Sequence, residues 1–126
     1  MIYGIGIDIV NISRMTQSLE RHDDKLAQRL LTSLEFEEFL QHPHQAIFLA
    51  KRFAVKEAVS KAFGTGFQQG LQHHHIGLTH DILGRPELLF YDTAKNWIEE
   101  RGITHSHVSL SDEKDTVIAY VVLEKK

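Results

Sequence analysis

The segment that decides the fold is Phe53–Gly66, which has the sequence FAVKEAVSKAFGTG. We predict a helix here, ended by Gly64 and Gly66, where a side chain would hinder a left-handed turn or an incoming ligand. Glu57 and Lys61 are four residues apart, so their side chains are neighbours on the helix surface. A solvated ion pair explains these two residues without any ligand, and a helix C-cap likewise explains the glycines.

The predicted helix extends back to about residue 45, so that it spans residues 45–63. Winding it at ~100° per residue gathers its apolar residues into one stripe. That stripe contains Ile47, Ala54, Val55, Ala58, Val59 and Ala62, and the opposite side contains Arg52, Lys56 and Ser60. Two residues break the pattern, because Lys51 lies on the apolar stripe and Phe53 lies among the polar residues. A large aromatic on a polar face indicates that a neighbouring helix or subunit covers it.

A strand is predicted at Ile2–Val10, where bulky and small residues alternate. The bulky face contains Tyr3, Ile5, Ile7 and Ile9, and the other face contains Gly4, Gly6 and Asp8. We expect the bulky face to lie in the core. The other face has no side chains before Asp8, because Gly4 and Gly6 leave only backbone there.

The remaining segments alternate between helices and strands. The predicted elements are a helix at 11–22, shorter helical pieces through residue 39, a polar loop at 64–77, short strands at 76–79 and 87–90, a helix from 92 or 93 to 102, a strand at 107–111, a turn at 112–115 and a strand at 116–123. The last strand is apolar almost throughout, so both of its faces need cover, and we expect a partner subunit to supply it.

Length and composition exclude several classes of protein. A chain of 126 residues is large enough for one domain, residues 1–126, with its own core. A net charge of −3 argues against a nucleic-acid binder, and no apolar run approaches the ~20 residues that span a bilayer. The absence of cysteine excludes disulfides, a thiol nucleophile and a zinc–thiolate site. Because the first residues also lack the basic start of a signal peptide, we expect a soluble, cytoplasmic protein.

Asp8 is the second informative residue, because acidic residues are depleted in strands and this one follows an apolar run. It could merely cap the next helix or mark the end of the strand. Alternatively it could be a ligand of a hard cation, since magnesium prefers one or two carboxylates, several waters and the oxygens of a substrate phosphate. Asp8 and Glu57 would supply that pair if the fold brings strand and helix together. Lys61 would then stand beside the phosphate as a positive charge or a proton donor.

Two histidine-bearing segments invite a functional interpretation. The adjacent histidines His73–His75 lie in a loop, where they cannot all face one ion, and no cysteine lies near them, so a zinc or nickel site is disfavoured. His107, Ser109 and Ser111 share one face of a predicted strand. They could donate hydrogen bonds to phosphate oxygens, or they could form an ordinary solvent-facing surface.

Basic residues recur near Asp8. Arg14, Arg21 and Lys25 follow each other at spacings of seven and four residues, which builds a basic stripe on a helix. Such a stripe is usually a solvated face. In a net-acidic protein, however, a local basic stripe is also a reasonable docking site for an acidic partner.

Three blocks of the chain carry a resemblance to a known family. The segments Gly4–Val10, Arg52–Ala62 and His107–Ser111 resemble, in the same order, the three signature blocks of the 4'-phosphopantetheinyl transferases, in particular their short bacterial type. The blocks span nearly the whole chain, and the combination is specific where no single block would be. The resemblance implies an α+β fold with a small antiparallel sheet packed against a long helix. It also implies a homotrimer with active sites at the subunit interfaces, which would cover the apolar strand at 116–123.

The resemblance implies a transfer reaction of fatty acid biosynthesis. The phosphopantetheine arm of coenzyme A moves to a serine of apo-acyl carrier protein, and adenosine 3',5'-bisphosphate is released. In the family, the residues that match Asp8 and Glu57 hold magnesium against the coenzyme A pyrophosphate. The match to Lys61 lies at the pyrophosphate, where it can protonate the leaving group.

The resemblance also assigns binding residues. The implied coenzyme A site contains Arg52, Lys61, Gly64, Thr65, Gly66, His107 and Ser109. The basic residues Arg14, Arg21 and Lys25 correspond to the surface that receives the acidic carrier protein.

Two positions depart from the family pattern. The longer, two-lobed branch has a third acidic ligand two positions after the aspartate, where this chain has Val10. Water would therefore have to take the place of that ligand on a bound metal. Many short members have histidine where this chain has Asp112, and a carboxylate there would repel a phosphate. Two other functions fit parts of the pattern: a non-catalytic module that docks an acidic partner, and a magnesium-dependent phosphohydrolase with water as acceptor.

Overall fold

The computed structural model describes residues 1–126 and has an α+β architecture, as predicted. Its elements are β1 (Ile2–Asn11), α1 (Ile12–His22), α2 (Asp24–Leu30), α3 (Ser33–Gln41), α4 (Gln45–Phe63), the 3-10 turn η1 (His73–His75), β2 (Ile76–His80), β3 (Pro86–Phe90), α5 (Asp92–Glu100), β4 (Ile103–Glu113) and β5 (Thr116–Lys125). The long helix has the predicted bounds, whereas β4 begins earlier than predicted, directly after α5. No helix is long and apolar enough to cross a membrane.

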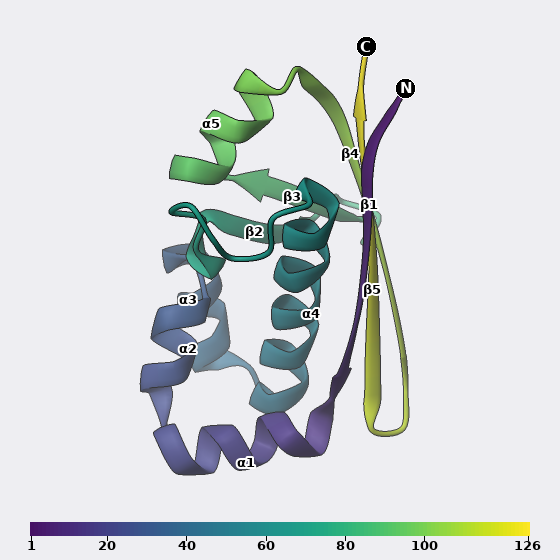
Figure 1. The fold of residues 1–126 in the computed structure, drawn as a ribbon. Coiled ribbons are helices and arrows are strands. Elements are labelled where there is room, and N and C mark those ends of the chain that lie inside the picture. The colour runs from purple at the N-terminus through teal and green to yellow at the C-terminus, as the bar shows by residue number, and fades with distance from the viewer.

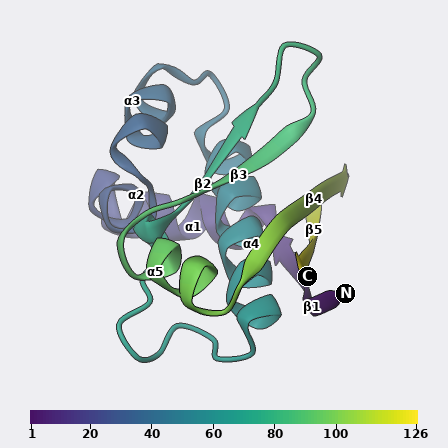
Figure 2. The same cartoon turned by 90° about the horizontal axis from the view of Figure 1, so that it is seen from above.

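The helix α4 is the centre of the molecule. On one side it packs on an antiparallel sheet with the strand order β1-β5-β4, and on the other side lie α2 and α3 (Figure 1). The view from above shows the same layers, with the separate β2–β3 hairpin projecting beyond them (Figure 2). Both termini lie at the same end of the sheet (Figure 1). An element in this position must be buried on two sides.

The strand β1 touches α4 backbone to backbone at two glycines. A Cβ atom on Gly4 would lie 2.0 Å from the carbonyl oxygen of Ala62, and one on Gly6 would lie 1.8 Å from that of Ala58. Two strand residues advance about 7 Å and one helical turn about 5.4 Å, so glycines two apart face carbonyls four apart. Any side chain at either position would collide with the helix backbone. The glycines therefore set how closely β1 approaches α4.

This close approach corrects the predicted orientation of β1. The isoleucines were expected in the core, but Ile5 and Ile7 are 55% exposed and Ile9 is 67% exposed. The glycine face lies against the helix instead, because only backbone fits between the strand and α4. Together with Ile118 and Tyr120 of β5, which are 37% and 41% exposed, the isoleucines form an uncovered apolar face, here called the outer face of the sheet.

The polar side of α4 does not face solvent. Arg52, Lys56 and Ser60 are all buried. The Nζ atom of Lys56 donates to Glu35 Oε1 at 2.7 Å and also to the carbonyl of Ile76. Periodicity identifies a polar side, but it does not reveal that α3 supplies a carboxylate to cover it.

The carboxylate of Glu35 joins three elements. Its oxygens accept hydrogen bonds from the backbone N–H of Thr32 at 3.0 Å and from that of Leu78 at 2.9 Å, in addition to the one from Lys56. Burial lowers the pKa of Lys56, and the charge of Glu35 acts in the opposite direction. A buried charge is tolerated when it is paired and fully hydrogen-bonded, so this cluster fixes α3 and β2 against α4.

Lys51, the cation on the apolar stripe, has a partner in the sheet. Its Nζ atom lies 3.7 Å from Asp112 Oδ1 near the end of β4. Lys51, which breaks the apolar stripe, therefore pairs with Asp112, which departs from the family pattern.

We expect Gly6→Ala to destabilise the protein by about 3 kcal/mol or more, at the upper end of overpacking costs, because the clash is with backbone that cannot rotate away. The matched control is Gly77→Ala in β2, where a Cβ atom would meet the Tyr91 ring at 3.3 Å. That exposed ring can shift, so the control should cost much less. Equilibrium unfolding in urea at one protein concentration measures both, and equal stability of the two variants would contradict the proposed contact.

Candidate functional site

Asp8 lies on the glycine face of β1, so its side chain points toward α4. The Nζ atom of Lys61 donates to Asp8 Oδ1 at 3.0 Å and to the carbonyl of Ile7 at 2.8 Å. Asp8 is mostly shielded, with 16% of its side chain exposed, whereas Lys61 is about half exposed. Strand and helix therefore meet at this residue pair, which was the condition that the sequence set for a site formed by both elements.

Glu57 is held by a different partner. Its Oε1 atom accepts a hydrogen bond from Nε2 of His73 at 3.0 Å. The predicted ion pair between Glu57 and Lys61 is not formed, because each side chain has another partner. Both residues nevertheless face the same region as Asp8, so the structure brings together the three residues for which catalysis was predicted.

His73 is a site residue that the sequence interpretation missed. Its ring stacks nearly parallel to two aromatic rings, with centroids 5.6 Å from Phe53 and 3.7 Å from Phe67 and interplanar angles of 12° and 18°. Phe53 is thereby covered in part by a loop of the same chain, and residues of α1 and α2, neighbouring helices of the kind that was expected, line a groove beside it. An aromatic on the polar side of α4 was the one available signal, but it could not identify its partner.

The site concentrates negative charge. Burial raises the pKa of Asp8 above its ordinary value, the Lys61 ammonium opposes this, and the nearby Glu57 carboxylate adds to the increase. Because the folded chain holds this proton more tightly than the unfolded chain, the stability from this group is present at low pH and falls as pH rises through the folded pKa. At neutral pH the ionised carboxylate is therefore a cost, which a bound cation would relieve.

The donor set suits a hard cation. Asp8 and Glu57 offer carboxylate oxygens from two elements, and no group of three or more His, Cys, Asp or Glu side chains is arranged around one point. Magnesium is commonly held by one or two carboxylates, with water and phosphate oxygens completing its six positions. The two carboxylates fit such an ion and do not form a closed zinc site.

The three histidines of η1 have different partners. His73 contacts Glu57, whereas the ring of His74 packs edge-on against that of His75 at 4.6 Å. His75 is buried, and its Nδ1 atom accepts a hydrogen bond from the backbone N–H of Gln72. Only His73 therefore contributes to the carboxylate site.

Arg52 lies one and a half turns before Glu57 and lines a different hollow. Its guanidinium lies 3.7 Å above the centre of the Phe48 ring and 3.8 Å from the carboxylate of Glu38. Its Nε atom is buried without a hydrogen-bond partner. Arg52 and Ser109 are both in the lining of this hollow, whose volume is about 700 Å³.

The glycine turn after α4 is a helix C-cap. Gly64 has a left-handed conformation with φ of 86°, and its N–H donates to the carbonyl of Lys61. The N–H of Gly66 donates to the carbonyl of Ser60, and the Thr65 hydroxyl donates to the carbonyl of Gly66. The turn begins three residues after Lys61, so it lies at the edge of the carboxylate site.

His107 lies on the other face of the sheet from Asp8. In the register of β5, His107 is opposite Val122 and Asp8 is opposite Ala119, and residues three apart on a strand point to opposite faces. The Nε2 atom of His107 lies 2.6 Å from Glu124 Oε1, which lowers the pKa of that carboxyl. One copy of the chain therefore does not bring His107 to Asp8.

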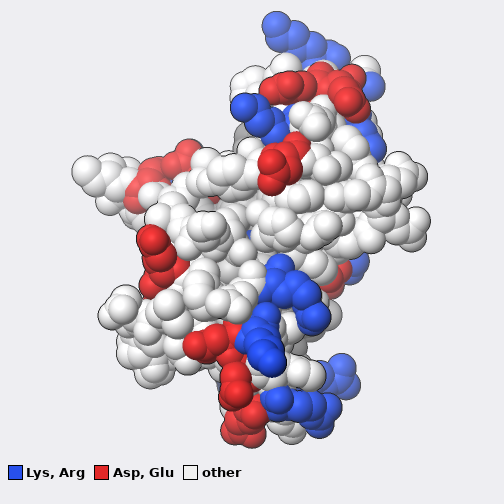
Figure 3. All heavy atoms as spheres, turned by 90° about the vertical axis from the view of Figure 1, so that its left-hand side faces the viewer, with Lys and Arg blue, Asp and Glu red and all other residues white.

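The basic stripe is divided between two helices. Arg14 and Arg21 lie on α1, but the chain turns at Asp23, with φ of 51°, so Lys25 lies in the first turn of a new helix, α2. Basic side chains gather at the α1 end of the molecule, and acidic ones lie among them (Figure 3). Arg14 also lines a groove of about 270 Å³ that reaches Phe53 beside the carboxylate site.

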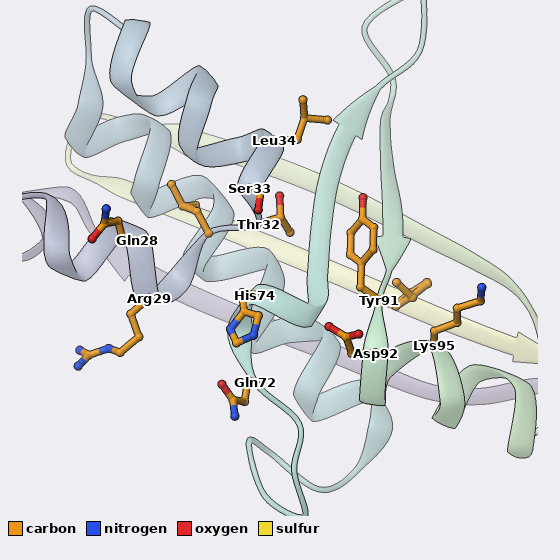
Figure 4. A pocket seen from close by; sticks show the side chains of 12 residues that line it. Gln28, Arg29, Thr32, Ser33, Leu34, Gln72, His74, Tyr91, Asp92 and Lys95 are labelled. Atoms are coloured by element: carbon orange, nitrogen blue, oxygen red, sulfur yellow. The ribbon is translucent and has the colours of Figure 1, made fainter.

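A larger hollow, of about 940 Å³, lies between α2, α3, η1 and α5. Its lining side chains come from opposite walls, and Arg29 extends away from Asp92 (Figure 4). Asp92 is the only carboxylate among the twelve lining residues, and none of the predicted site residues is among them. Size alone does not make a catalytic site, so the chemistry is assigned to the carboxylates at the β1–α4 contact.

Comparisons with known proteins point to one family. Residues 4–121 match the family described as the 4'-phosphopantetheinyl transferase superfamily. The holo-[acyl-carrier-protein] synthase of Nitrosospira multiformis is 48% identical over 125 residues, covering 99% of this chain and all of the relative. The crystal structure of the holo-[acyl-carrier-protein] synthase from Neisseria meningitidis has a TM-score of 0.94 at 46% identity, covering 99% of this chain and 100% of that chain.

A third relative has a bound ligand. The holo-(acyl-carrier-protein) synthase from Bacillus anthracis, solved in complex with CoA (3',5'-ADP), has a TM-score of 0.82 at 34% identity. The match covers 100% of this chain and 99% of that chain. The similarity therefore extends over the whole fold, including β1 and α4.

Proposed function

Because this chain belongs to the 4'-phosphopantetheinyl transferase superfamily, we propose that it transfers the phosphopantetheine arm of coenzyme A to a serine of apo-acyl carrier protein. The products are holo-acyl carrier protein, for fatty acid biosynthesis, and adenosine 3',5'-bisphosphate. The observation that carries the proposal is the meeting of Asp8, Glu57 and Lys61 at the β1–α4 contact. Full-length relatives that are holo-[acyl-carrier-protein] synthases support it.

The chain's own residues supply the proton transfers. The serine oxygen forms a bond to the phosphorus that carries the pantetheine arm, and the bond from that phosphorus to the bridging oxygen breaks. Glu57, directly or through a water, accepts the serine proton. Lys61, whose ammonium is half exposed beside Asp8, stands where it can stabilise or protonate the departing phosphate.

Asp8 and Glu57 would hold a magnesium ion, which when bound would neutralise the pyrophosphate and orient it for in-line attack. Arg52, with its buried Nε atom lacking a hydrogen-bond partner, and Ser109 would line the coenzyme A site together with the Gly64–Gly66 turn. Asp112, the carboxylate that would repel a phosphate, lies beside the Lys51 ammonium. This positive charge makes Asp112 repel a phosphate less than an unpaired carboxylate would.

We also propose that the active protein is a homotrimer. The outer face of the sheet is apolar and uncovered, and large patches of this kind usually mark an interface. A second copy on this face would also explain why His107 lies away from Asp8, since an interface site takes residues from two copies. The cytoplasm is the location that we expect for such an assembly.

Docking of the carrier protein would use the α1 end of the molecule. Arg14 and Arg21 on α1 and Lys25 on α2 are exposed cations that suit an acidic surface. The groove from Arg14 ends at Phe53, whose ring stacks on the His73 that contacts Glu57, so this groove is the route that we assign to the serine.

We expect Glu57→Gln to lower the rate of transfer by about 10²–10⁴-fold, because the amide cannot accept the serine proton. Its free energy of unfolding should change by less than about 1 kcal/mol, since the side chain is partly exposed. The assay follows labelled pantetheine from coenzyme A to apo-acyl carrier protein with magnesium present. Glu100→Gln, an exposed change on α5, is the matched control and should retain full activity.

The same assay separates the competing functions. Coenzyme A cleavage with water as acceptor would indicate a phosphohydrolase, and carrier binding without any transfer would indicate a non-catalytic module. Either result for the wild-type protein would overturn the proposed function.

We expect Ile7→Glu to convert the trimer into a monomer, because it places a charge at the centre of the outer face. Sedimentation of the wild type should give three times the 14.5 kDa mass of the chain, and that of the variant a single mass. Ile82→Glu, at a fully exposed position in the β2–β3 turn, is the matched control and should leave the trimer intact. A wild type that sediments as one chain would exclude the trimer.

A further inference from the structure

We propose that His73 is a positioning residue that holds the Glu57 carboxylate in place for cation binding and for accepting the serine proton. This inference rests on the proposed function and adds a residue to it. No signature block of the sequence contains His73, which lies in the loop between α4 and β2. The hydrogen bond that it makes to Glu57, and the way in which its own ring is fixed, carry the inference.

The hydrogen bond constrains one end of the carboxylate. An ionised carboxylate can only accept, so Nε2 of His73 donates its proton to Glu57 Oε1, 3.0 Å away. A glutamate side chain has three rotatable bonds, and without a partner its oxygens would sample several positions. Engaging Oε1 leaves the second oxygen to face a cation beside Asp8. An orienting hydrogen bond of this kind is typical of carboxylates that ligate metals.

The ring of His73 is itself fixed by two aromatic rings. Phe53 of α4 and Phe67 of the following loop stack on it at 5.6 Å and 3.7 Å, nearly parallel to it. Such stacking sets the plane of the imidazole, and with it the direction of its N–H. An ordinary surface histidine is not expected to pack against two aromatic rings.

The turn that carries His73 is tied to α4 through the residue next to Glu57. Lys56, buried at 1% exposure, donates to the carbonyl of Ile76, the first residue after η1. On the other edge of η1, the N–H of Tyr91 donates to the carbonyl of His75 at 2.8 Å. Two consecutive residues of α4 therefore hold both ends of the His73–Ile76 segment: Lys56 binds the backbone of Ile76, and Glu57 binds the side chain of His73.

The test separates the hydrogen bond to Glu57 from the aromatic stacking of His73. His73→Phe keeps an aromatic ring against Phe53 and Phe67 but has no donor for Glu57. His73→Gln loses the stack but keeps an N–H that can reach the carboxylate. His74→Gln is the matched control, since His74 belongs to the same turn and makes no contact with Glu57.

The first readout is binding of manganese as a stand-in for magnesium, measured by electron paramagnetic resonance on the protein with coenzyme A. We expect His73→Phe to weaken manganese binding about 10–100-fold, the usual loss when the hydrogen bond behind a metal ligand is removed. His73→Gln should recover part of this loss, and His74→Gln should bind like the wild type. The second readout is kcat for transfer to apo-acyl carrier protein, which should follow the same order.

Two outcomes would overturn the inference. Unchanged manganese binding in His73→Phe would mean that the hydrogen bond does not position the carboxylate. Tighter binding in that variant would mean that His73 competes with the cation instead of orienting its ligand. Failure of the proposed function is a separate result, because there the wild type itself would transfer no pantetheine.

Discussion

The contact between two glycines of β1 and two carbonyls of α4 is the constraint on which the rest of the structure depends. With Gly4 and Gly6 against Ala62 and Ala58, strand and helix approach to backbone distance. The next residue on that face is Asp8, and the closeness of the layers is what lets its carboxylate bond to Lys61. A wider separation would leave Asp8 in a gap, remote from the helix that carries the other two residues of the site.

The same contact decides what the other face of the sheet must do. Because the glycine side is taken by α4, the isoleucines of β1 are turned outward, where a single copy leaves them uncovered. Exposure of an apolar outer face to water is unfavourable for a single subunit, and burial of that face against another copy would remove this cost. The candidate site and the apolar outer face thus have a common origin, since the alternation of glycine and isoleucine that admits the helix also turns the isoleucines outward.

Much of this could be predicted from the sequence, and the failures have physical reasons. The bounds of α4 followed from its periodicity and glycine stop. That Asp8 and Glu57 form one site was a hypothesis from the residues and from the family resemblance, and the structure places the two carboxylates near enough for Glu57 to raise the pKa of Asp8. The predicted orientation of β1 was wrong because large apolar side chains normally face the core. Here the backbone of α4 itself fills the space on the inner side of the strand, so only the glycine face fits there. Burial of Lys56 and the contact of His73 depend on partners 21 and 16 residues away, which local patterns cannot supply.

The central claim is that the β1–α4 contact builds a cation site from Asp8 and Glu57. The most direct measurement is a crystal structure of the protein with coenzyme A and manganese, in which anomalous scattering locates the metal. A peak between the two carboxylates, within bonding distance of an oxygen of each and of the pyrophosphate, is the predicted result. A peak bound by neither carboxylate, for example at the histidines of η1, would contradict the claim.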